Sequence, residues 1–315
     1  MTSPVVSSLL PVVLLIAAGF VAGKRRLVGP ASVKDLSNLI FLLLAPALLF
    51  RSMSSVHVEA LRLEPVAAYF IASFLLFGGT MLVQGFTRAA AVLGLARTYS
   101  NNVMIGIPLI ALAFGPDGTV VLLTLISLHA LVLLTSATVV LEVAAAREHA
   151  VPGGEGPHSM ARTVLRALRN AIIHPVPLPI IAGLLFGQTG WQLPAVVDRT
   201  LALLGQAFGP IALVMVGITL SFTPIGTHWR GALVQAAMKN LVHPLLVAAI
   251  GWALGVRGLP LAVMTVAAAL PIGANVFLFS QRYRTSEELV TSSMAVSTLL
   301  ALATVSATMA ASAYF

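Results

Sequence analysis

The sequence contains no cysteine, which excludes a disulfide framework and any metal site built on thiolates. Charged residues are also scarce: they make up 9% of the 315 residues, whereas soluble domains carry about 25%. Hydrophobic residues make up 58%, and the mean hydropathy is +0.99. Because so few charged side chains cannot cover a surface that faces water, most of the chain is expected to lie in a lipid bilayer.

The motifs of several other functions are also missing. The sequence has neither an HExxH zinc motif nor a GxxxxGK[ST] phosphate-binding loop. The histidines at 129, 174 and 243 lie in different apolar stretches, and no acidic residue lies near the middle of any stretch. We therefore expect no enzyme activity, no metal and no organic cofactor. The net charge of +8 comes from scattered basic residues without an aromatic-basic stripe, which argues against a nucleic-acid partner.

What remains is a series of apolar stretches of the length that crosses about 30 Å of hydrocarbon. They predict an all-α polytopic membrane protein with ten transmembrane helices, at 4–23, 33–53, 64–86, 89–114, 117–141, 171–188, 196–220, 230–254, 259–281 and 286–313. Residues 144–169 are rich in glycine and charge, and they are interpreted as a cytoplasmic linker between two halves, 1–143 and 170–315.

The basic residues between the stretches predict the orientation, because loops rich in lysine and arginine stay in the cytoplasm. With both termini on the non-cytoplasmic side, thirteen of these residues fall in cytoplasmic gaps and four in outer gaps. The thirteen include Arg97, which lies close to the end of a span.

Five spans on either side of the linker suggest an internal repeat. Spans 2 and 7 each carry a proline, Pro46 and Pro210, which we interpret as structural breaks. An odd number of spans in each repeat requires the second copy to be inverted, as in many secondary transporters.

Spans 4 and 9 are the expected binding region, because both contain glycine and proline in their interior. Such interruptions free backbone groups, which hydrocarbon tolerates only where they are buried in protein or line a polar cavity. Amide and hydroxyl side chains lie beside both. The residues concerned are Gly106 and Pro108 with Ser100, Asn101 and Asn102 in span 4, and Pro271, Gly273 and Asn275 in span 9.

Two motifs resemble the auxin efflux carrier family, which includes plant auxin carriers and bacterial carriers of malonate or malate. The segment NNVMIGIPL at 101–109 is similar to the family's fourth-helix motif, and ALPIGANVFLFSQRY at 269–283 to the ninth-helix motif of its bacterial members. The resemblance implies two inverted five-helix repeats with crossing broken helices. It also implies a scaffold of spans 1, 2, 6 and 7, a moving transport domain of spans 3–5 and 8–10, an elevator mechanism, and a homodimer in the bacterial inner membrane.

Carried over by residue, Asn101 matches the family's asparagine before the break, and Pro108 and Pro271 match its crossover prolines. Asn275 matches the bacterial pattern and not the plant one. Arg284 stands where many bacterial members have glycine, at the cytoplasmic end of the motif.

Lys239 is the clearest ionisable residue inside a span. It is interpreted either as a counter-charge for a substrate carboxylate or as a structural lysine that caps carbonyls freed at a neighbouring break. His129 and His243 could carry protons, or could be neutral and bonded to backbone. Together with Ser100 they are candidates for coupling to a proton or an ion.

These observations predict a secondary transporter for a small organic anion, a carboxylate, dicarboxylate or auxin-like acid. A channel or a membrane sensor for a small solute is the alternative. Coupling to Na⁺, coupling to H⁺ and uncoupled export all stay open, as do the substrate and the direction of transport.

Overall fold

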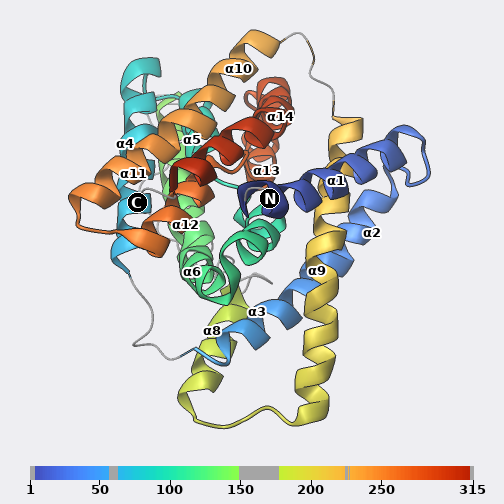
Figure 1. The fold of residues 1–315 in the computed structure, drawn as a ribbon. Coiled ribbons are helices and arrows are strands. Elements are labelled where there is room, and N and C mark those ends of the chain that lie inside the picture. The colour runs from blue at the N-terminus through green and yellow to red at the C-terminus, as the bar shows by residue number, and fades with distance from the viewer. Residues whose placement is uncertain (1–3, 57–62, 149–176, 224–225, 227, 313–315) are drawn as a thin grey trace.

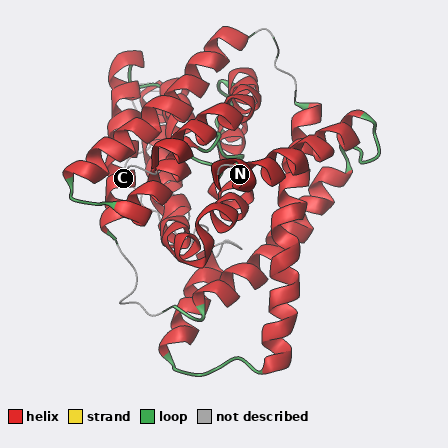
Figure 2. Cartoon of the chain, in the orientation of Figure 1, coloured by secondary structure: helices red, strands yellow, loops and turns green. Residues whose placement is uncertain are grey.

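The computed structural model describes residues 4–56, 63–148, 177–223, 226 and 228–312. In these ranges the protein consists of helices and loops, and no strand is formed (Figure 2). Most of the predicted linker at 144–169, and His174 at the start of the sixth predicted span, lie outside the described residues.

The helices follow the apolar stretches of the sequence. Their bounds are α1 Pro4–Lys24, α2 Ser32–Leu39, η1 Ile40–Leu44, α3 Ala45–Met53, α4 Glu64–Gln84, α5 Arg88–Thr98, η3 Asn102–Gly106, α6 Ile107–Glu148, α8 Pro177–Gln188, α9 Ala195–Phe222, α10 Trp229–Ala237, η4 Met238–Val242, α11 His243–Ala253, α12 Gly258–Ala269, α13 Asn275–Arg282 and α14 Glu287–Ser312. The η elements are π-helical turns.

Six helical stretches in the described ranges are long and apolar enough to cross a membrane: Ser32–Met53, Glu64–Gln84, Asn102–Ala145, Ala195–Phe222, Trp229–Ala253 and Glu287–Ser312. Three further apolar helices are shorter, at Leu10–Lys24, Leu178–Gln188 and Gly258–Ala269. The long helix α6 is two helices that meet at Gly115, whose φ of 65° and ψ of −159° no helix contains. The protein is therefore a multi-pass membrane protein.

The helices form two groups (Figure 1). In one group α1 packs along α9, and α3 packs against α8 and α9. The other group contains α4, α5 and α10–α14, with α6 packed against α5 and α12. We call the first group, which consists of α1, α2, η1, α3, α8 and α9, the α1–α9 group.

The contact between α1 and α9 depends on glycine. A Cβ atom added at Gly217 would lie 1.9 Å from the carbonyl oxygen of Ile16, and one added at Gly19 would lie equally close to the carbonyl oxygen of Val214. Both neighbours are backbone atoms, which cannot rotate away. Small residues let membrane helices approach this closely, so that dispersion forces hold them together where hydrocarbon supplies no hydrophobic drive.

Three of the prolines in apolar helices lie just after a π-helical turn. Pro46 follows η1, Pro108 follows η3, and Pro244 follows η4. A proline ring clashes with the carbonyl four residues earlier in an α-helix. A π-turn shifts the hydrogen-bonding pattern from i−4 to i−5, so the wider turn accommodates the ring.

The predicted break at Pro210 is wrong, and the predicted break at Pro46 is limited to the π-helical turn η1. The chain stays helical through η1 into α3, and α9 runs without interruption past Pro210 from Ala195 to Phe222.

Replacing Gly217 by alanine should lower the thermal unfolding midpoint of the purified protein in detergent. The new methyl group would push α1 away from α9, and overpacking of this kind costs about 1–3 kcal/mol. Gly79→Ala in α4 is the matched control, because nothing lies within 4 Å of its added Cβ. Its midpoint should stay the same or rise, since alanine favours a helix interior over glycine by about 1 kcal/mol. Equal midpoints for the two variants would contradict this account of the contact.

Candidate functional site

The centre of the protein is a crossing of two interrupted helices. Helix α5 ends at Thr98 and α12 ends at Ala269, and the residues that follow are extended. Ser100 and Ile272 face each other as an antiparallel bridge. Around this pair, the amide of Gly273 donates to the carbonyl of Tyr99 at 2.9 Å, and the amide of Asn101 donates to the carbonyl of Pro271 at 2.9 Å.

This bridge satisfies backbone groups that the two interruptions release. An unpaired amide or carbonyl costs several kcal/mol in hydrocarbon, so each open segment supplies partners for the other. We call residues 99–101 and 270–273 the crossing segments. The first lies several residues before Gly106 and Pro108, which belong to η3 and to the first turn of α6.

Two glycines permit the close approach of the crossing segments. A Cβ on Gly273 would lie 2.8 Å from the ring of Tyr99 and 3.1 Å from the carbonyl oxygen of Ser100. A Cβ on Gly106 would lie 2.8 Å from the side chain of Leu270. Both predicted glycines therefore have a steric role at the crossing.

The three predicted asparagines lie at this crossing with different partners. The Nδ2 of Asn275 donates to the hydroxyl of Tyr99 at 2.8 Å. Asn101 is half-buried, and its carbonyl accepts from the amides of Ile105 and Gly106 at the start of the next helix. Asn102 is 2% exposed, and its side chain lies near the Tyr69 hydroxyl, but neither its Nδ2 nor its Oδ1 forms a well-aligned hydrogen bond with a described residue.

An unsatisfied buried amide is costly. Leaving such a group without a partner costs about 1–3 kcal/mol, so each one needs an explanation, and a bound ligand or water is one of them. Asn102 is also the first residue of η3, which leads directly into α6. Its amide therefore lies beside a helix N-terminus, which favours negative charge.

A buried hydroxyl network holds the first crossing segment. The hydroxyl of Tyr69 in α4 lies 2.8 Å from Ser100 Oγ and 3.2 Å from His129 Nε2, and it donates to the carbonyl of Thr98 at 3.4 Å. Ser73, one turn further along α4, lies 3.0 Å from His243 Nε2. The predicted residues Ser100, His129 and His243 are thus brought together around Tyr69, which sequence reasoning did not identify.

Lys239 lies against the second crossing segment. Its side chain is completely buried, and Nζ donates to the carbonyl of Ala268 at 2.5 Å and to that of Leu270 at 2.8 Å. These carbonyls have lost their helical partners because α12 ends at Ala269. Of the two interpretations of this lysine, the contacts match a cap on freed carbonyls.

The neighbouring Asn240 fixes η4 to α14. Its Nδ2 donates to the carbonyl of Ser297 at 3.0 Å, and its Oδ1 accepts from the Ser297 hydroxyl at 2.6 Å. The same hydroxyl accepts from the amide of Ile272 at 3.1 Å. One serine therefore connects η4, α14 and the second crossing segment.

Arg97 lies inside the protein and not in a cytoplasmic gap, which corrects its use as an orientation signal. It is 7% exposed, and its Nε donates to Gln235 at 2.8 Å while Nη1 donates to Thr80 at 3.0 Å. Its position near the end of a span was the only sequence signal, because a buried arginine with neutral partners has no recognisable motif.

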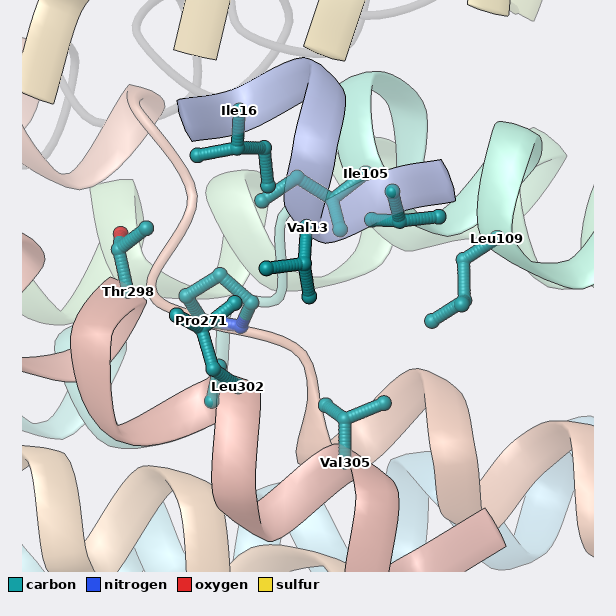
Figure 3. A pocket seen from close by; sticks show the side chains of 10 residues that line it. Val13, Ile16, Ile105, Leu109, Pro271, Thr298, Leu302 and Val305 are labelled. Carbon is teal, nitrogen blue, oxygen red and sulfur yellow. The ribbon is translucent and has the colours of Figure 1, made fainter. Parts of the chain in front are cut away.

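A small apolar cavity lies between α1 and the second crossing segment (Figure 3). Val13, Ile105, Leu109, Pro271 and Val305 are among the side chains that line it, and they come from α1, η3, α6, the crossing and α14. Its volume of about 30 Å³ leaves room for one or two waters and for no organic acid.

Comparison with known proteins decides the family. The model of the membrane transport protein family, the family of the auxin efflux carriers, matches residues 4–309. The chain belongs to this family.

Individual members of the membrane transport protein family are similar over most of their length. A Rhizobium meliloti (strain 1021) protein named "Putative malonate transporter" is 28% identical over 280 residues, which cover 86% of this chain and 84% of the relative. An "Uncharacterized transporter" of Methanothermobacter thermautotrophicus is 23% identical, with 94% of both chains covered. "Auxin efflux carrier component 8" of Arabidopsis thaliana is 21% identical, with 95% of both chains covered.

Tyr69→Phe should destabilise the crossing. The change removes the hydroxyl that Ser100 and His129 share. Both buried groups then lose a hydrogen-bond partner, which lowers the free energy of unfolding by about 1–3 kcal/mol. Thermal unfolding of the purified protein in detergent measures the loss. Thr200→Val is the control, since this exposed hydroxyl donates only to the carbonyl of Val196 in its own helix, at 2.9 Å. If both variants unfold at the wild-type midpoint, the Tyr69 network does not hold the segment.

Proposed function

We propose that this protein is a secondary transporter of a small organic anion, and that the anion binds beside the crossing of the two interrupted helices. The observation that carries the proposal is the buried amide of Asn102, which forms no well-aligned hydrogen bond with a described residue and lies at the start of a helix. The names of two relatives, a malonate transporter and an auxin efflux carrier, support a carboxylate as the substrate.

The chemistry of the crossing suits a carboxylate. The Nδ2 of Asn102 can donate to one carboxylate oxygen. The backbone amides at the starts of η3 and α13 bond to carbonyls of the preceding residues, so these helix ends contribute their partial positive charge to the site. Asn275 begins α13 and is already oriented by the Tyr99 hydroxyl. Carboxylate hydrogen bonds to such donors are about twice as strong as neutral ones.

We further propose that the chain forms ten spans in two inverted five-helix repeats. Matching contacts support this arrangement: α1 packs on α9, and α3, of the second predicted span, packs on α8, of the sixth. The same operation exchanges the two crossing segments, which pair antiparallel.

In this proposal the α1–α9 group is the scaffold and the remaining helices form the transport domain, which moves as an elevator. Gly209 of α9 lies at the boundary, where an added Cβ would be 3.3 Å from Pro108. A glycine here presents a smooth helix surface to the moving crossing. A homodimer in the bacterial inner membrane, with both termini outside and Na⁺ or H⁺ as the coupling ion, belongs to the same proposal.

Asn102→Ala should reduce saturable anion uptake into proteoliposomes. Labelled malonate, malate and indole-3-acetate are offered in turn, with and without a sodium gradient. Loss of a hydrogen bond to a charged group, about 1.5–3 kcal/mol, predicts a fall of about 10- to 150-fold in kcat/KM for the transported acid.

Asn38→Ala, at an exposed position on α2, is the matched control and should transport normally. Uptake by Asn102→Ala at the control rate would remove this residue from the site. Flux that never saturates would indicate a channel, and binding without flux would indicate a sensor.

A further inference from the structure

We infer that the ammonium group of Lys239 is a tethered cation, which fills a cation position at the broken end of α12 and thereby frees transport from any need for Na⁺. The inference rests on the proposed transport function and specifies its coupling. The position beside the freed carbonyls of α12, which the Lys239 side chain fills, is one that a soluble ion could also occupy.

The ligands of Lys239 are those of a cation site. In carriers with interrupted helices, unwound carbonyls and half-helix C-termini bind Na⁺. Here Ala268 and Leu270 direct two such carbonyls at Nζ. The C-terminus of α12 adds the partial negative charge of the helix dipole, about half an elementary charge.

Nothing else in the described structure neutralises this side chain. None of the described acidic residues forms an ion pair with Lys239, since the ion pairs there join Arg51 to Asp198 and His228 to Glu288. A buried cation without a carboxylate needs several oriented dipoles to offset its lost hydration. Backbone carbonyls at a helix end provide them.

The lysine is also fixed to the element that it neutralises. Asn240 and Ser297 bind η4 to α14, and the Ser297 hydroxyl accepts from the amide of Ile272 in the second crossing segment. The positive charge therefore moves with that segment. A soluble ion would have to bind before each transport step, whereas this cation is always present.

The buried position explains why Lys239 is a poor direct ligand for the substrate. Its Nζ already donates to two carbonyls, and the side chain has no exposed surface. Its field instead favours an anion near the crossing without contact. This role separates it from Asn102, whose amide has free donors.

The test replaces the tethered cation by soluble ones. Lys239→Ala removes the ammonium and the stem beyond Cβ, leaving the carbonyls of Ala268 and Leu270 with space for an ion. Thermal unfolding of the purified protein is measured in sodium chloride, ethylammonium chloride and choline chloride of equal ionic strength. We expect the variant to unfold at a lower temperature than wild type in choline and to recover by several degrees in sodium or ethylammonium. Wild type should show no difference between the three salts.

Uptake into proteoliposomes is the second readout. Wild-type anion uptake should be unchanged when choline replaces sodium, while Lys239→Ala should lose at least about 10-fold in choline and regain part of it in sodium or ethylammonium. Lys239→Met fills the space without charge or donors, so it should unfold at a lower temperature than wild type, transport poorly and respond to no cation. Lys34→Ala, at an exposed lysine of α2, is the control and should behave as wild type.

Three results would overturn the inference: a sodium requirement in wild type, normal uptake by Lys239→Met, or a Lys239→Ala variant whose unfolding ignores all three salts. If Lys239→Ala can be isolated in sodium or ethylammonium but not in choline, this cation dependence supports the inference. If the variant cannot be isolated in any of the three salts, the result counts against the inference. Unfolding needs no substrate. A cation-dependent midpoint without transport of any acid would thus refute the proposed function and leave the cation position standing.

Discussion

The structure depends on one constraint: backbone groups released inside a membrane protein must find partners within the protein. Two helices are interrupted near the centre of this molecule, and water cannot be relied on there. The chain meets the constraint by crossing the two interruptions, so that the amides of Asn101 and Gly273 bond to carbonyls of the other segment. Gly273 matters here because a Cβ atom on it would crowd the Tyr99 ring and the backbone carbonyl of Ser100. Tyr69 donates to the freed carbonyl of Thr98, and Lys239 donates to those of Ala268 and Leu270.

Much of this fold follows from composition and spacing. Apolar stretches of about 20 residues bounded by charge or glycine predict helices, and most of the described helices follow those stretches. The exception is α6, which continues through the predicted gap after residue 114 and extends to Glu148, inside the predicted linker. Proline was the less reliable signal. Pro210 does not interrupt α9, and Pro46 is accommodated by the π-turn of η1. The sequence alone does not distinguish a proline that breaks a helix from one that a wider turn absorbs, because the difference lies in which carbonyl the preceding turn leaves free.

The sequence predicts only part of the candidate site, because it shows the residues beside the interruptions but not their partners on other helices. Asn101, Asn102 and Asn275 stand out because amides beside helix interruptions are visible in a linear sequence. Tyr69 does not stand out, since a tyrosine in an apolar helix is ordinary and its partners Ser100 and His129 are 31 and 60 residues away. Arg97 resembles a residue of a cytoplasmic gap in the sequence, because it lies near the end of a span. Its burial depends on Gln235 and Thr80, which come from other helices. Long-range packing, which no local pattern contains, decides both cases.

The two interruptions are held in corresponding ways with different chemistry. In each proposed repeat, the third span supplies a side chain to the carbonyls at the end of the broken helix: Tyr69 of α4 reaches Thr98, and Lys239 of η4 reaches Ala268. A hydroxyl can satisfy a carbonyl without adding charge, whereas an ammonium adds a full positive charge at the same kind of place. If packing alone governed these positions, two neutral donors would suffice and would avoid burying a cation. With the tethered cation inferred for Lys239, the crossing would be electrostatically asymmetric, and a bound anion would lie in a field that the symmetric backbone of the two crossing segments would not produce.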